Sequence, residues 1–180
     1  EYFGDGSRFT APDQTPIKIQ YAYEKELLGT AGAIKNAGKL VTEDAFYVLN
    51  ADTFYQIDYS RLAQMQAEKD LDLALVLREV PDISRYGEAT LDQGMLTGFN
   101  EKTSEARPGT INGGIYYMKR ELLDEIPEGK VSLENEMIPK WLGEKRRLGG
   151  FVHDGYFIDI GIPEAYYQFM DDVEKGVIRW

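Results

Sequence analysis

The sequence contains no cysteine, a single histidine and no long apolar run. Without cysteine there is no disulfide, no thiolate metal site and no cysteine nucleophile, which is compatible with a cytoplasmic protein. The lone His153 argues against a Ser-His-Asp triad and against a histidine-rich zinc site. No stretch approaches the roughly 18 apolar residues that a membrane-spanning helix needs, and the first residues show no signal-like apolar segment.

Basic residues are also scarce, because 20 Lys and Arg stand against 31 Asp and Glu, a formal net charge of −11. This balance argues against a nucleic-acid backbone as partner. A phosphorylated substrate would need a metal ion or a locally basic pocket to offset the repulsion. The 180 residues, 43% of them hydrophobic and 28% charged, are otherwise typical of one globular domain with a substantial core.

Helices and strands are predicted to alternate in the first half of the chain, and hairpin-like strands follow. This order predicts an α/β fold with a Rossmann-like mixed, mostly parallel sheet flanked by helices, and one domain over residues 1–180. The predicted strands are 17–23, 45–49, 72–80, 88–91, 95–99, 115–118 and 156–160. The predicted helices are 31–37, 60–69, 120–126, 133–145 and one that begins at Pro163.

Two acidic residues stand at predicted strand ends. Asp52 directly follows the apolar strand 45–49, and Asp159 lies in strand 156–160, two residues before Gly161. Ligands of open α/β sheets bind at the carboxyl ends of strands, and carboxylates are natural ligands of Mg²⁺. Two local interpretations stay open, because Asp52 also suits a turn and Asp159 also suits a helix cap.

Other segments carry weaker signals. The small residues from Leu28 to Gly32 precede a predicted helix, so their N–H groups could meet an anion or a base edge, although such a segment is often a plain turn. Lys102 could offset a phosphate charge, and Glu101 and Asn112 could bind sugar hydroxyls. Solvated surface charge is the ordinary interpretation of a Glu-Lys pair.

Taken in order, these segments resemble those of the sugar-1-phosphate nucleotidyltransferases. Residues 23–34 (YEKELLGTAGAI) resemble the base-binding segment, and residues 48–53 (VLNADT) resemble the metal-binding strand end. Four further segments resemble the family's sugar-binding and second metal-binding segments. They are RYG at 85–87, FNEK at 99–102, INGGIY at 111–116 and FIDIG at 157–161. Within the family, INGGIY and the ending YFIDIGIPEAYYQF favour members that form a GDP-heptose.

The resemblance implies that a sugar 1-phosphate attacks the α-phosphorus of a nucleoside triphosphate, GTP by the finer likeness, so that a nucleotide sugar and pyrophosphate form. It implies that Mg²⁺ is held by Asp52 and Asp159, and that these two residues and Lys102, at the sugar phosphate, are catalytic. It implies a sugar pocket at Gly87, Glu101, Asn112 and Gly113, and a base pocket at Leu28, Gly29, Thr30 and Gly32.

One part of the family pattern has no counterpart in these residues, namely the Gly-rich G-G-x-G-T-R-L loop and the Pro-Lys-Pro segment. We therefore expect a nucleotidyltransferase domain that lacks the usual N-terminal phosphate loop, and that neither folds well alone nor is fully active. A homo-oligomer is left open. The alternatives are a mannose- or glucose-1-phosphate nucleotidyltransferase, an inactive sugar-nucleotide-binding subunit, or a metal-dependent glycosyltransferase, whose usual Asp-x-Asp is Asn50-Ala51-Asp52 here.

Overall fold

The computed structural model describes residues 2–84, 86–102 and 105–178, with 101 and 102 described by their backbone alone. The strands are β1 (Ala45–Leu49), β2 (Thr53–Tyr55), β3 (Leu73–Val80), β4 (Gly87–Asp92), β5 (Met95–Lys102), β6 (Gly109–Lys119), β7 (Leu148–Val152) and β8 (Phe157–Asp159). The helices are α1 (Gly29–Gly38), α2 (Ser60–Lys69), α3 (Leu122–Glu125), the π-helix η1 (Leu133–Met137), α4 (Ile138–Gly143) and α5 (Pro163–Glu174).

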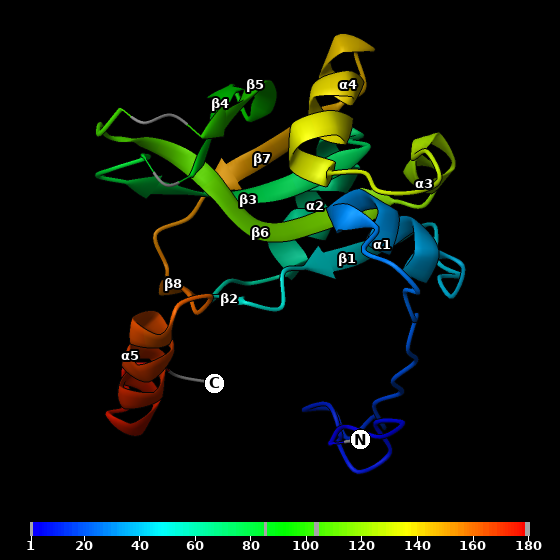
Figure 1. Cartoon of the computed structure of the whole chain (residues 1–180), viewed down its shortest axis with the longest axis vertical. Coiled ribbons are helices and arrows are strands. Elements are labelled where there is room, and N and C mark those ends of the chain that lie inside the picture. The colour runs from blue at the N-terminus through cyan, green and yellow to red at the C-terminus, as the bar shows by residue number, and fades with distance from the viewer. Residues whose placement is uncertain (1, 85, 103–104, 179–180) are drawn as a thin grey trace.

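A six-stranded sheet in the order β1-β6-β3-β7-β5-β4 forms the body of the molecule, and β2 and β8 pair in a separate ribbon beside it (Figure 1). The predicted α/β class with a mixed sheet flanked by helices is confirmed. The pairing is more antiparallel than predicted, because β6 lies antiparallel between β1 and β3 while β3 and β7 pair in parallel. The 11 residues of β6 make it long enough to pair with both neighbours.

The prediction of a strand over residues 17–23 is wrong. Tyr21 and Tyr23 are exposed, and the described backbone here forms no strand ladder. An alternating pattern needs a partner strand to become a ladder, and none of the described strands pairs with this segment. Conversely, β7 was not predicted, because Gly149 and Gly150 dilute its apolar pattern. A methyl group on Gly150 would collide with the carbonyl oxygen of Leu75, so glycine permits the close pairing.

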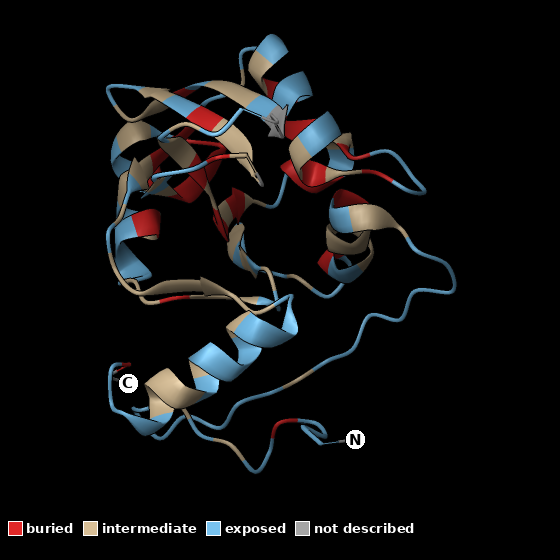
Figure 2. Cartoon of the chain, turned by 60° about the vertical axis from the view of Figure 1, so that its left-hand side comes forward, coloured by how far each residue is buried: buried red, intermediate tan, exposed pale blue. Residues whose placement is uncertain are grey.

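Strand β3 is buried on both faces, which explains its continuous apolar run. Leu73, Leu75 and Leu77 belong to a core shared with α1, α3, η1 and α4, whereas Ala74 and Val76 belong to a core shared with α2. The buried residues concentrate in this two-sided body (Figure 2). Helix α5 projects from the ribbon and has no buried residue. None of the helices within the described residues is both long and apolar enough for a bilayer crossing.

Candidate active site

A cavity of about 450 Å³ opens where β1 ends, between the ribbon, the first turn of α1 and the start of η1. It brings together four residues that the sequence singled out, namely Thr30, Gly87, Asn112 and Asp159. Four more lining residues, Asn50, Tyr86, Phe99 and Asn100, lie in the segments that resemble the family, whereas Ser132, Glu134 and Asn135 were not singled out.

The carboxylates of Asp52 and Asp159 border one small space beside Gly161. Asp52 directly precedes β2 and Asp159 ends β8, and the antiparallel ribbon places Thr53 opposite Asp159. The N–H of Ile160 donates to the carbonyl oxygen of Asp52 at 2.8 Å. A methyl group on Gly161 would lie 3.0 Å from Oδ1 of Asp159 and 3.7 Å from Oδ2 of Asp52. The ribbon therefore brings the two predicted metal ligands together.

This pair of carboxylates fits a hard divalent cation. Oδ1 of Asp159 accepts the N–H of Gly161 at 2.9 Å, which fixes its orientation. Within the described residues no group of three or more His, Cys, Asp or Glu side chains could hold a metal, so the protein offers two acidic ligands. Mg²⁺ is commonly bound by one or two carboxylates together with substrate phosphates and water. None of the described lining residues is cationic, and a bound divalent cation would offset the charge of an anionic ligand.

The segment predicted to bind a base packs against the chain that precedes η1. Gly29 has φ +70°, and a methyl group there would lie 2.6 Å from the carbonyl oxygen of Val131. The same oxygen accepts the N–H groups of Ala31 at 3.0 Å and Gly32 at 3.3 Å, and the carbonyl oxygen of Leu28 accepts the N–H of Val131 at 2.8 Å. The small residues thus have a packing role, and the predicted base contacts of Leu28, Gly29 and Gly32 stay predictions.

In the predicted sugar segment, hydrogen bonds fix the Asn112 side chain at the cavity. Its Nδ2 donates to the hydroxyl of Tyr116, and its Oδ1 accepts the N–H of Gly114 at 3.1 Å. Gly113 is buried, because a methyl group there would lie 2.7 Å from the ring of Tyr55. Asn112 therefore faces the cavity, whereas Gly113 supports the strand behind it.

The remaining predicted residues lie along the β4–β5 hairpin. Gly87 stands at an irregularity in the strand register, and a methyl group there would lie 2.8 Å from the carbonyl oxygen of Asn100. Glu101 and Lys102 are the last residues of β5. Their side chains, and residue 85 of the RYG segment, lie outside the described residues, so their predicted roles stay predictions.

Glu134 is the most informative residue that the sequence did not single out. It lies in the predicted helix 133–145, where an acid in the first turn is explained by the helix dipole alone. The observed turn is a π-helix, a form that is frequent at functional sites. Glu134 accepts hydrogen bonds from Thr30 and from Tyr116. Burial, and then the nearby charge of Glu134, raise the pKa of Tyr116 well above its usual value, so its hydroxyl keeps its proton.

A larger cavity of about 720 Å³ lies at the opposite end of β1. Two of its lysines are paired within the protein, since Lys35 lies 3.6 Å from Glu128 and Lys119 contacts Asp70 and Asp72. This cavity contains none of the residues that the sequence singled out, so the site of interest is the smaller cavity at the strand ends.

Comparison with known proteins decides the family. Residues 1–176 match the family model described as nucleotidyl transferase. The chain belongs to the nucleotidyl transferase family. The resemblance inferred from the sequence motifs is thereby confirmed.

The chain is similar to D-glycero-alpha-D-manno-heptose 1-phosphate guanylyltransferase of Campylobacter jejuni, with 40% identity over 86% of this chain and 67% of the relative. It is 31% identical to mannose-1-phosphate guanylyltransferase of Mycobacterium tuberculosis over 97% of this chain and 48% of the relative. The crystal structure of HddC from Yersinia pseudotuberculosis has a TM-score of 0.72 and 36% identity, over 83% of this chain and 64% of that chain. HddC was also solved in complex with GMP-PN. The chain thus spans between about half and two thirds of these proteins.

Proposed function

We propose that this protein transfers a guanylyl group from GTP to D-glycero-α-D-manno-heptose 1-phosphate, giving a GDP-heptose and pyrophosphate. The family supports the reaction class, and the name of the Campylobacter jejuni relative supports the sugar and the base. The observation that carries the proposal is the cavity itself, where a wall of mostly neutral hydrogen-bonding side chains includes Asp159, and the carboxylate of Asp52 lies close by, beside Gly161. Such a wall suits a sugar, and the carboxylates suit a metal-bound phosphate.

In this proposal Asp52 and Asp159 would hold Mg²⁺, which would supply positive charge to offset the charge of the phosphates. Neither carboxylate could meet a triphosphate directly without electrostatic repulsion. Their placement on one short ribbon fixes the two ligands relative to each other. The net charge of −11 is then compatible with phosphorylated substrates, because acidic side chains recruit the cation that phosphates need.

The other residues position the two substrates. Asn112 and Gly87, with Glu101 and Gly113 as further candidates, would bind the sugar, and Lys102 would contact its phosphate. Leu28, Gly29, Thr30 and Gly32 would adjoin the base. An oxygen of the sugar phosphate then forms a bond to the α-phosphorus as the bond to pyrophosphate breaks, and pyrophosphate leaves with that electron pair. Correct placement of the reacting groups can supply about 7–11 kcal/mol of the barrier reduction.

The test is pyrophosphate release by the purified protein with GTP, MgCl₂ and D-glycero-α-D-manno-heptose 1-phosphate. We expect kcat/KM for the heptose 1-phosphate to exceed that for mannose 1-phosphate by at least about tenfold, since a missing hydroxyl partner in a polar site is costly. A preference for mannose 1-phosphate, favoured by the Mycobacterium tuberculosis relative, would overturn the sugar assignment. Release of GDP from a supplied GDP-sugar would instead identify a glycosyltransferase. We also infer a cytoplasmic location, where nucleoside triphosphates are available.

Gly161→Ala should lower kcat for this reaction about tenfold while leaving thermal unfolding almost unchanged. The added methyl group would lie 3.0 Å from Oδ1 of Asp159, which is tight enough to displace that carboxylate. Gly161 does not have a positive φ, so alanine suits its backbone. Gly143→Ala is the matched control, because a methyl group there meets nothing within 4 Å. Equal kcat values in the two variants would show that the space beside Gly161 has no role in turnover.

A further inference from the structure

The carboxylate of Glu134 joins three elements that lie far apart in the chain. Its Oε2 accepts the hydroxyl of Thr30, from α1, at 2.7 Å. Its Oε1 accepts the hydroxyl of Tyr116, from β6, at 3.0 Å. Glu134 itself belongs to η1. Both oxygens therefore accept a hydroxyl from a distant element, one from the predicted base segment and one from the strand that carries the predicted sugar ligand, and Oε2 also accepts the nearby hydroxyl of Ser132 at 3.4 Å.

Each donor is held in place by a further hydrogen bond. The Oγ1 of Thr30 accepts the N–H of Leu133 at 2.7 Å, so its own proton is directed to Glu134. The hydroxyl of Tyr116 donates its only proton to Glu134, so it must act as acceptor toward Asn112. This settles which end of the Asn112 amide is the nitrogen. The second proton of Nδ2 and a lone pair of Oδ1 are then left to face a ligand.

We propose that Glu134 is a positioning residue that holds Thr30 and Asn112 at the same time, and so couples binding of the nucleotide base to binding of the sugar. This inference rests on the proposed function. Glu134 does not have to touch the reacting phosphates, because it acts through the orientation of two other side chains. A carboxylate is required in this position, since both of its oxygens must accept and neither may donate.

Three substitutions test separately the two hydrogen-bond links that Glu134 makes, one to Thr30 and one to Tyr116. In Glu134→Gln the amide nitrogen cannot accept a hydroxyl proton, so one of the two links is lost in either orientation, and we expect KM to rise about tenfold for both substrates. Thr30→Val breaks the link to α1, so KM for GTP should rise about tenfold and KM for the sugar phosphate should stay within twofold. Tyr116→Phe breaks the link to β6, and the opposite selectivity is expected.

Glu136→Gln is the matched control, because Glu136 lies in the same helix and is exposed. Its Oε1 accepts the N–H of Ser132 at 2.8 Å, outside the connection to Thr30 and Tyr116. We expect both KM values of this variant to stay within twofold of the wild-type values, with at most a small fall in the thermal unfolding midpoint. The two Glu→Gln variants therefore compare the same chemical change at a residue that positions Thr30 and Asn112 and at a residue that does not.

The measurement is initial-rate kinetics with GTP and heptose 1-phosphate both varied, and thermal unfolding of every variant. If Tyr116→Phe fails to fold, Glu134→Gln and Thr30→Val decide. A Glu134→Gln protein with both KM values unchanged, or with only kcat and stability lowered, would overturn the positioning role. Equal changes in the two KM values of Thr30→Val would also overturn it. A wild-type protein that releases no pyrophosphate would instead overturn the proposed function, so the two failures are distinguishable.

Discussion

Asp52→Asn and Asp159→Asn should each lower kcat for pyrophosphate release by about 10³-fold, which corresponds to about 4 kcal/mol of activation free energy. Each substitution keeps the shape of the side chain and removes the charge that would bind Mg²⁺. The proposed site has only these two described acidic ligands, so the loss of either leaves a single carboxylate beside Gly161. Asparagine can still accept the N–H of Gly161 in the second variant, so thermal unfolding should change by no more than about 2 °C.

Asp154→Asn is the matched control, because Asp154 lies between β7 and β8 and its side chain is fully exposed. We expect its kcat to equal that of the wild type. Pyrophosphate release should be measured over a range of MgCl₂ concentrations, since a weakened metal site is partly restored by excess metal. Near-normal turnover of Asp52→Asn or Asp159→Asn at low magnesium would show that the residue concerned is not a metal ligand.

The positions of the two carboxylates at strand ends could be predicted from the sequence because each follows from a local pattern, whereas their role as metal ligands was implied by the family resemblance. The apolar run 45–49 forms β1 and is followed within three residues by Asp52, and the sheet rule places ligands at such an end. The run that contains Asp159 forms β8 in the same way. What the sequence could not supply is the antiparallel pairing of β2 with β8 that makes the two acids neighbours, since β2 is only three residues long.

Glu134 could not be predicted because its function depends on contacts between distant residues. The hydrogen bond between Thr30 and Glu134 joins residues 104 positions apart, and no local pattern encodes it. The wrong strand at 17–23 has a related cause, because alternation describes the two faces of a strand but does not supply the neighbour that completes the ladder. Local patterns therefore predicted many of the helices and strands, and the long-range pairings that build the cavity required the structure.

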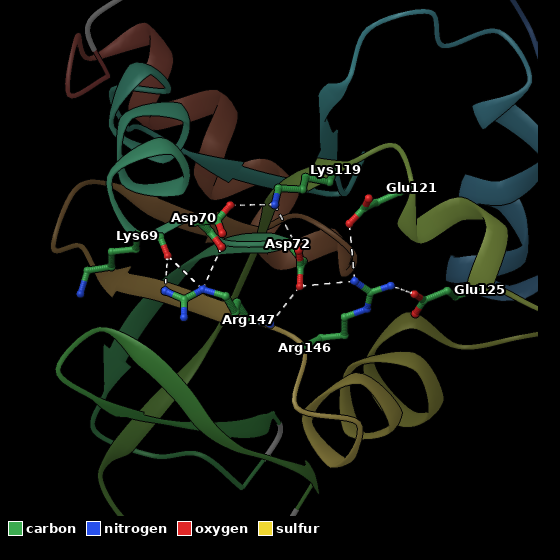
Figure 3. A network of polar contacts seen from close by, with 8 residues as sticks. All are labelled: Lys69, Asp70, Asp72, Lys119, Glu121, Glu125, Arg146 and Arg147. Atoms are coloured by element: carbon green, nitrogen blue, oxygen red, sulfur yellow. Dashed lines mark hydrogen bonds and ion pairs between the residues drawn. The ribbon is translucent and has the colours of Figure 1, made fainter.

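Asp72→Asn should lower the free energy of unfolding by about 3 kcal/mol, and the thermal midpoint by about 6–12 °C. Asp72 precedes β3, and its side chain is only 9% exposed. Figure 3 shows its carboxylate between basic residues, with Oδ1 3.2 Å from Nζ of Lys119 and Oδ2 3.8 Å from a terminal nitrogen of Arg146. Oδ2 also accepts the N–H of Arg147 at 3.0 Å. One carboxylate thus ties the end of β6 and the chain entering β7 to the start of β3.

The Asp72→Asn substitution is costly because Lys119 and Arg146 keep their positive charges and lose the negative charge that lies between them. Burial alone would lower the pKa of Lys119, but hydrogen bonds to Asp70 and Asp72 outweigh it and raise the pKa above its usual value. A lysine pKa that is higher in the folded state adds stability below its unfolded value of about 10.4, and this stability is lost as pH rises through the folded value. Asp72→Asn should therefore also weaken the fall in stability that the wild type shows above about pH 10.

Asp70→Asn is the matched control, because Asp70 contacts the same Nζ of Lys119 at 3.1 Å but its side chain is 79% exposed. Asn also tolerates the left-handed backbone of this position, where φ is 48°. Solvent screens the exposed pair, so its loss should cost much less than the loss of Asp72. Chemical denaturation of both variants at pH 7 decides the comparison. Equal losses would show that the number of contacts to Lys119, rather than the burial of Asp72, determines the stability of this junction.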